Sequence, residues 1–198
     1  MRSIVEAKTG LEVRRVISNR PEAAGLEWAR GHGLQTKVVD HKSFASREAF
    51  DAAMAEAIDG DRPDLILLAG FMRIFTPGFI ARFPRRILNI HPSLLPSFPG
   101  LHTHRQALAA GVKVHGATVH VVTPALDNGP VVIQGAVPVV SGDSEESLAA
   151  RVLEVEHRIY PQAVRWFVEG RIDFDGDVVR VAGSGVSSDY MISPRNSQ

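Results

Sequence analysis

The chain has 198 residues, which is the size of one domain or at most two small ones. Its 22 basic and 22 acidic side chains balance, so no overall field attracts nucleic acid or an anionic membrane surface. The absence of cysteine excludes a disulfide scaffold, a cysteine–zinc site and a thiolate nucleophile. No apolar run approaches the roughly 20 residues that span a bilayer, and the first residues lack a signal-peptide pattern. We therefore expect a soluble cytoplasmic protein.

Apolar runs alternate with amphipathic stretches along the first half of the chain. This alternation is typical of an α/β protein with a mostly parallel twisted sheet and helices on both faces. In chain order we predict a strand at 13–17, a helix at 23–30, a strand at 38–39, a helix from the Ser46 cap through Ile58, a buried strand at 64–70, a short helix at 77–83 and a second buried strand at 87–89.

The pattern changes in the second half. Residues 115–122 and part of 131–139 alternate apolar and polar side chains. The segment 124–130 between them is rich in Pro, Asp, Asn and Gly, which favours a turn. We predict two antiparallel strands added to the parallel sheet.

The last third begins with a long helix. Ser144 is a plausible N-cap, and Pro161 is expected to kink this helix or to start another that ends near Gly170. Asp175-Gly176 between two apolar runs predicts a small hairpin at 172–181. We expect one domain over residues 1–182 and a flexible tail over 183–198, because the tail is rich in Gly and Ser and has no periodicity.

Polar residues end the buried strand at 87–89 and continue into a loop stiffened by three prolines. Ligands of open α/β sheets bind beyond the carboxyl ends of the strands, and alternation puts Asn89 and His91 on the same side. Asn89 offers an uncharged N–H donor suited to an oxyanion, and His91 offers a group that titrates near neutral pH. The best candidate for a carboxylate that orients the imidazole is Asp127, in the tight turn at 126–130.

Each of these features also has a structural interpretation. An Asn–His pair at a strand end often only caps a loop, and an Asp-Asn-Gly sequence often only supplies turn conformations. The histidines at 102, 104 and 120 suggest a metal site, but the chain has no cysteine and no His-Glu-x-x-His motif, which disfavours one. His120 is equally consistent with a hydrogen-bonded inward histidine, and segment 71–75 with core plus loop.

Five segments stand out by their order and spacing: 69–74, 89–104, 115–120, 126–130 and 156–161. Together they resemble the phosphoribosylglycinamide formyltransferase family over nearly the whole chain, up to about Arg171. The resemblance implies a Rossmann-like formyltransferase fold with antiparallel additions in the C-terminal half. It also implies transfer of a formyl group from the cosubstrate 10-formyltetrahydrofolate to the amine of glycinamide ribonucleotide, in purine biosynthesis. It implies no metal, no nucleic acid and no membrane partner, and a monomer or homodimer.

The resemblance also assigns residues. Asn89, His91 and Asp127 match the catalytic trio, in which Asn89 and protonated His91 stabilise the oxyanion and Asp127 helps to move the proton of the amine. The residues that match ribonucleotide-binding positions are Gly70, Pro92 and Glu156. Those that match folate-binding positions are Arg47, Leu68, Met72, Arg73, Ile74, Phe75, Val122, Thr123, Ala125 and Leu126.

The chain departs from the family at its start. A first strand and a Gly-x-Gly-Ser-Asn phosphate loop precede the matched segments in the family, whereas Met1 here aligns with the helix after that loop. We expect Met1 to be an internal methionine of a longer natural protein, and the sheet of this chain to have a gap. The alternative function is a folate-binding or formyltetrahydrofolate-hydrolysing protein of the same fold with impaired ribonucleotide binding.

Overall fold

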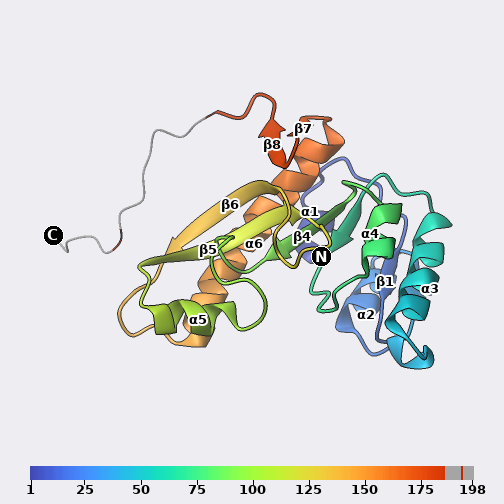
Figure 1. The fold of residues 1–198 in the computed structure, drawn as a ribbon, viewed down its shortest axis with the longest axis horizontal. Coiled ribbons are helices and arrows are strands. Elements are labelled where there is room, and N and C mark those ends of the chain that lie inside the picture. Colours follow the sequence, from blue (N-terminus) through green and yellow to red (C-terminus); the bar gives the residue numbers. More distant parts are fainter. Residues whose placement is uncertain (186–192, 194–198) are drawn as a thin grey trace.

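The computed structural model describes residues 1–185 and residue 193. Helices and strands alternate through most of this part of the chain (Figure 1). The helices are α1 (Arg2–Glu6), α2 (Ala24–Gly31), α3 (Arg47–Asp59), α4 (Pro77–Arg82), α5 (Thr103–Ala110) and α6 (Glu145–Val168), with a 3-10 turn at His41–Ser43. The strands are β1 (Val16–Ser18), β2 (Thr36–Val38), β3 (Ile66–Leu68), β4 (Ile87–His91), β5 (Val114–Val121), β6 (Val131–Pro138), β7 (Ile172–Asp175) and β8 (Val178–Val181).

The largest sheet has four strands in the order β3-β4-β5-β6. β3 and β4 are parallel, whereas β5 pairs antiparallel with β4 and β6 pairs antiparallel with β5. The prediction of an α/β protein with antiparallel strands in its second half is confirmed. β4 is therefore the strand at which the sheet changes from parallel to antiparallel pairing.

The parallel strands do not form one continuous sheet. β1 pairs only with β2, in a two-stranded sheet that is separate from the sheet that begins with β3. The Val16 N–H donates to the carbonyl of Gln35 at 2.8 Å, and the Ile66 N–H donates to that of Arg86 at 2.7 Å. Alternation along the strands therefore turns the N–H groups of Ile17 and Leu67 toward the unpaired edges. The expectation of a gap in the sheet is confirmed at this place.

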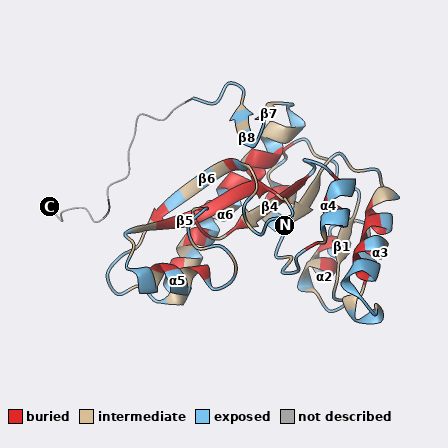
Figure 2. Ribbon diagram, in the orientation of Figure 1, coloured by how far each residue is buried: buried red, intermediate tan, exposed pale blue. Residues whose placement is uncertain are grey.

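Helix α6 lies against β5 and β6 and covers one face of the four-stranded sheet (Figure 1). Its core face includes Val152 and Val164, and Figure 2 shows buried residues in β4, β5 and this helix, with a second set in α3. At Gly135 the helix approaches so closely that an added Cβ would lie 2.1 Å from a methyl of Val155. The expectation that Pro161 starts a second helix is wrong, since Pro161 is buried inside one helix from Glu145 to Val168. Packing on both sides of the proline outweighs the hydrogen bond that its ring removes.

A second apolar cluster joins α3, α4 and the neighbouring strands. α3 begins at Ser46, whose Oγ accepts the Ala49 N–H at 3.1 Å, so the predicted cap is confirmed. The hairpin β7–β8 is antiparallel, as predicted, with Gly176 at φ +61° in its turn. Of the predicted tail, only residues 183–185 and 193 belong to the described part of the chain. Within that described part, no helix is long and apolar enough to cross a bilayer.

Candidate active site

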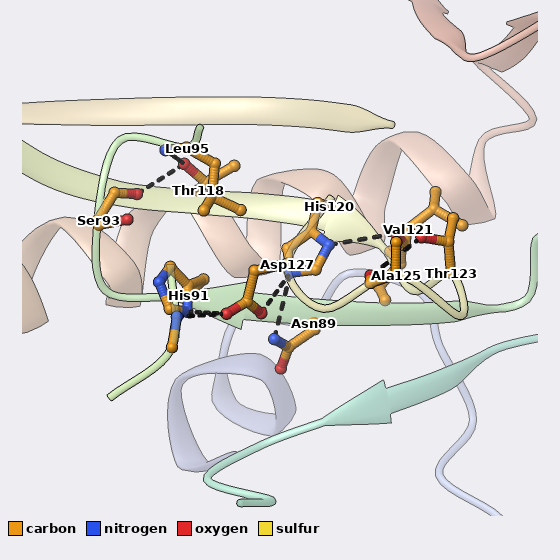
Figure 3. Close-up of polar contacts among 12 residues, drawn as sticks. Asn89, His91, Ser93, Leu95, Thr118, His120, Val121, Thr123, Ala125 and Asp127 are labelled. Atoms are coloured by element: carbon orange, nitrogen blue, oxygen red, sulfur yellow. Dashed lines mark hydrogen bonds and ion pairs between the residues drawn. The ribbon is translucent and has the colours of Figure 1, made fainter. Parts of the chain in front are cut away.

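The carboxyl end of β4 carries two polar side chains on one face of the sheet, Asn89 and His91 (Figure 3). The antiparallel register with β5 places His120 opposite Asn89 and Thr118 opposite His91. Because neighbouring strands alternate in phase, all four side chains share this face. His91, Thr118 and His120 are buried, so the site rests on the rigid centre of the sheet.

Asp127 reaches this face from the loop between β5 and β6. One carboxylate oxygen lies 3.5 Å from His91 Nδ1, and the other lies 3.9 Å from His120 Nε2. The first oxygen also accepts the Gly100 N–H at 2.8 Å. Asp127 has φ +48°, a conformation that Asp and Asn adopt more readily than other non-glycine residues. The turn therefore brings the predicted carboxylate to the predicted imidazole.

Both nitrogens of the His91 ring face acceptors. Nδ1 faces the Asp127 carboxylate, and Nε2 lies 3.0 Å from the carbonyl oxygen of Phe98. A neutral imidazole carries one N–H, so only the doubly protonated ring donates to both acceptors. These two acceptors suit a doubly protonated ring, which can donate to a developing oxyanion only when one of its N–H groups leaves its present acceptor.

His120 fixes the orientation of the Asn89 amide, a role that sequence reasoning missed. Its Nδ1 lies 3.2 Å from the carbonyl oxygen of Val121, so Nδ1 carries the proton and Nε2 accepts from the Asn89 amide nitrogen at 3.2 Å. Burial lowers the pKa of His120, which keeps the ring neutral and able to accept. His120 thus fixes which end of the Asn89 amide is the nitrogen and leaves the second N–H of that nitrogen for another acceptor.

Thr118 holds the segment that follows His91. Its hydroxyl donates to the carbonyl of Ser93 at 2.7 Å and accepts the Leu95 N–H at 3.0 Å. The side chain of Gln134 donates to the same hydroxyl at 3.0 Å. These bonds fix the start of the loop whose later residues contact His91 and Asp127. No local sequence pattern indicated this role, because it depends on pairing between strands.

The predicted folate residues fall into two groups around the ends of β3 and β5. Leu68, Phe75 and Val122 belong to one apolar cluster that includes the partly buried Phe71. Met72, Ile74 and Leu126 expose large apolar side chains, with Met72 73% exposed. Large exposed apolar side chains of this kind are common on ligand-binding surfaces.

The remaining predicted folate residues contact their neighbours. Arg47 donates through Nε to the carbonyl of Ile74 at 2.7 Å, and the Arg73 guanidinium lies 5.4 Å from the centre of the Phe50 ring. The Thr123 hydroxyl donates to the carbonyl of Ala125 at 3.3 Å in the loop that holds Asp127. The structure thus places Arg47 of α3 against the segment after β3, and Arg73 of that segment against Phe50 of α3.

The three predicted ribonucleotide residues come from separate elements. Gly70 follows β3 with φ +67° and open space around it, and Pro92 follows β4. Glu156 is half-buried on α6, and this burial raises the pKa of its carboxyl. It lies one helical turn from Tyr160, whose hydroxyl is 2.9 Å from the carbonyl oxygens of β3 and β4 residues. Gly70 and Pro92 therefore lie at the carboxyl ends of β3 and β4, whereas Glu156 lies on α6 close to the amino group of Met1.

Histidines do not combine into a metal-ligand set in the described part of the chain, where no group of three or more His, Asp and Glu side chains is suited to hold an ion. The arrangement instead offers a neutral amide donor, a ring suited to positive charge and a carboxylate around one point. Such a set stabilises an oxyanion and moves a proton.

Comparisons with known proteins agree with this geometry. The formyl transferase family model matches residues 2–164. A phosphoribosylglycinamide formyltransferase of Escherichia coli K12 is 52% identical over 160 residues, which cover 81% of this chain and 76% of that protein. The crystal structure of glycinamide ribonucleotide transformylase 1 from Symbiobacterium toebii superposes with a TM-score of 0.88 at 49% identity, over 91% of this chain and 87% of that one.

A more distant likeness is to the crystal structure of a formyltetrahydrofolate deformylase from Pseudomonas syringae. Its TM-score is 0.83 at 28% identity, over 91% of this chain and 61% of that one. The family match extends from α1 into α6 and so contains every residue of the site at the end of β4. The chain belongs to the formyl transferase family.

Proposed function

We propose that this protein transfers the formyl group of 10-formyltetrahydrofolate to the primary amine of glycinamide ribonucleotide. The observation that carries the proposal is the meeting of Asn89, His91 and Asp127 at the end of β4, with the Asp127 carboxylate 3.5 Å from the His91 ring. The two substrates are inferred from the names of the relatives, and the roles of the three side chains are inferred from their geometry.

The amine lone pair attacks the formyl carbon, and the carbonyl π electrons move to its oxygen. Asn89 and protonated His91 donate hydrogen bonds to this oxyanion. The bond between carbon and folate N10 then breaks, and N10 takes up the proton that the amine loses. Asp127 helps to move this proton through water. Loss of one such oxyanion donor costs about 3–4 kcal/mol in other enzymes.

The surface beside the trio supports a folate ligand. Met72, Ile74 and Leu126 expose apolar side chains that suit the flat faces of a pterin and its benzoyl group, and Leu68 at the end of β3 pairs directly with Asn89. The reactive formyl group would then lie over the end of β4. The ribonucleotide is proposed to contact Gly70 after β3, Pro92 after β4 and Glu156 on α6.

Formyltetrahydrofolate hydrolysis, or folate binding alone, is the second candidate. The likeness to a formyltetrahydrofolate deformylase favours it, and so does the division of the sheet next to the proposed ribonucleotide site. In hydrolysis a water molecule replaces the amine at the same carbon. The trio would stabilise the same kind of oxyanion in both reactions.

We also propose that the protein acts in the cytoplasm as a monomer or homodimer. Both proposed substrates are charged, water-soluble metabolites, which supports this location. Light scattering at working concentration measures the oligomeric state directly.

The test is a turnover assay with and without millimolar glycinamide ribonucleotide, in which mass spectrometry detects the formylated product. Product that forms only with the ribonucleotide supports the transfer. Folate turnover without it supports hydrolysis, and binding of a folate analogue with no turnover supports a binding protein. Asn89→Ala should reduce kcat by about 10²-fold or more, whereas Asn128→Ala, exposed in the loop of Asp127, should not.

A further inference from the structure

Asp51 is a buried carboxylate that the proposed chemistry does not use. It lies on the inner face of α3 and is 4% exposed. Within the described residues it forms no ion pair, and its Oδ2 accepts the main-chain N–H of Thr76 at 2.6 Å. A charge buried without a cation is costly, and hydrogen bonding to the charged form offsets this cost. Apolar packing alone therefore does not explain a carboxylate at position 51, and its hydrogen bond to Thr76 indicates a further role.

The partner of Asp51 closes the segment between β3 and α4. This segment, 69–76, contains four of the predicted folate residues, at positions 72–75. Its last residue, Thr76, also caps α4, because its hydroxyl accepts the Phe79 N–H at 3.3 Å. Asp51 therefore fixes the point at which the segment joins the next helix.

Two polar side chains of α3 hold neighbouring parts of this backbone. Arg47 donates to the carbonyl of Ile74, and Asp51, one helical turn later, accepts from the N–H of Thr76. Between them Phe75 is buried, and its ring stacks on that of Phe79 with centres 3.8 Å apart. The two bonds therefore fix Ile74 and Thr76 on either side of a buried aromatic anchor.

The side chains that this backbone presents are exposed and apolar. Met72 is 73% and Ile74 48% exposed, so the positions of these side chains depend largely on the main chain. We propose that Asp51 is a positioning residue that sets the backbone of 72–76 and thereby the affinity for the folate cosubstrate, without touching it. This inference rests on the proposed function.

The experiment compares Asp51→Ala and Asp51→Asn with Asp59→Ala in steady-state kinetics with both substrates varied. Asp59 ends the same helix in an exposed ion pair with Arg82, so it serves as the matched control. Asp51→Ala should raise KM for 10-formyltetrahydrofolate about 10-fold, with kcat and KM for the ribonucleotide changed less than about 2-fold. Asp51→Asn keeps an acceptor without the charge and should raise the same KM about 3-fold. Asp59→Ala should change neither KM.

An unchanged folate KM in Asp51→Ala, or an equal change in both KM values, would overturn the inference. If Asp51→Ala does not fold, the folate KM of Asp51→Asn decides in the same way. If the wild-type protein shows no ribonucleotide-dependent turnover, the proposed function fails, and the Kd of a folate analogue then replaces KM. Hydrogen exchange adds a readout independent of both substrates, because the Thr76 amide should exchange faster in Asp51→Ala than in Asp59→Ala.

Discussion

Replacing Asp127 by Asn removes one negative charge from the site and little else. Asn has nearly the same shape, adopts the φ of +48° found here, and keeps an oxygen that accepts the Gly100 N–H. The loop between β5 and β6 should therefore keep its position. The change tests whether the charge beside His91 drives the reaction.

The distance between the Asp127 carboxylate and the His91 ring sets the size of the expected effect on kcat. At 3.5 Å and an effective dielectric constant of about 20, the carboxylate and a protonated His91 attract each other by about 5 kcal/mol. If most of this attraction acts when the oxyanion forms, kcat falls on the order of 10³-fold, at about 1.4 kcal/mol for each factor of 10. Folate binding does not require this charge, so the Kd of a folate analogue should change less than about 3-fold.

The assay is single-turnover formyl transfer at saturating concentrations of both substrates, with analogue binding followed by fluorescence. Asp175→Asn, which removes an exposed carboxylate that pairs with Arg180 in the β7–β8 hairpin, is the control and should leave kcat unchanged. A fall of less than 10-fold in Asp127→Asn would refute the electrostatic argument. An equal loss of turnover and of folate binding would show that Asp127 holds the loop instead.

Three further predictions concern the framework. Tyr160→Phe should lower the free energy of unfolding by about 1–3 kcal/mol in urea titrations, because it removes the one hydroxyl proton that the carbonyls of Leu68 and Leu88 share. Burial lowers the pKa of His115 from 6.5 to about 4, so the unfolded chain takes up the proton first and stability falls as the pH drops from 6.5 to 4. His115→Phe should remove about 3 kcal/mol of this decline, and an unchanged pH profile would contradict the assignment. Hydrogen exchange should be much faster at the amides of Ile17 and Leu67, which face the gap, than at Ile66, whose N–H is paired.

That Asn89, His91 and Asp127 meet was predictable from the sequence, because each of them has a local signal. Asn89 and His91 lie at the polar end of a buried apolar strand, and Asp127 lies in a turn segment rich in Pro, Asp, Asn and Gly. The supporting residues have no such signal. Thr118 and His120 act through the register between β4 and β5, which alternation along one strand does not determine.

The sequence-based predictions of two helices, α5 and α6, were wrong for the same physical reason. α5 was not predicted, because its N-cap, His102, has φ +58° and makes no side-chain capping bond. Pro161 was expected to kink α6 or to start another helix, yet α6 continues past it as one helix because tertiary packing on the sheet outweighs the local preference of proline. Sequence patterns report local preferences, and both elements depend on contacts with distant residues.

The change from parallel to antiparallel pairing at β4 explains why this strand can carry the site. In the antiparallel pair, Asn89 has His120 directly opposite, close enough for one side chain to orient the other. The alternate residues of β5, Val119 and Val121, are buried in the core beneath α6. Because the period along a strand is two, a slip by one residue would move His120 into the core and a valine into the site. The packing of α6 on Val119 and Val121 therefore stabilises the strand register that places His120 opposite Asn89. In this way the core also stabilises the orientation of the Asn89 amide.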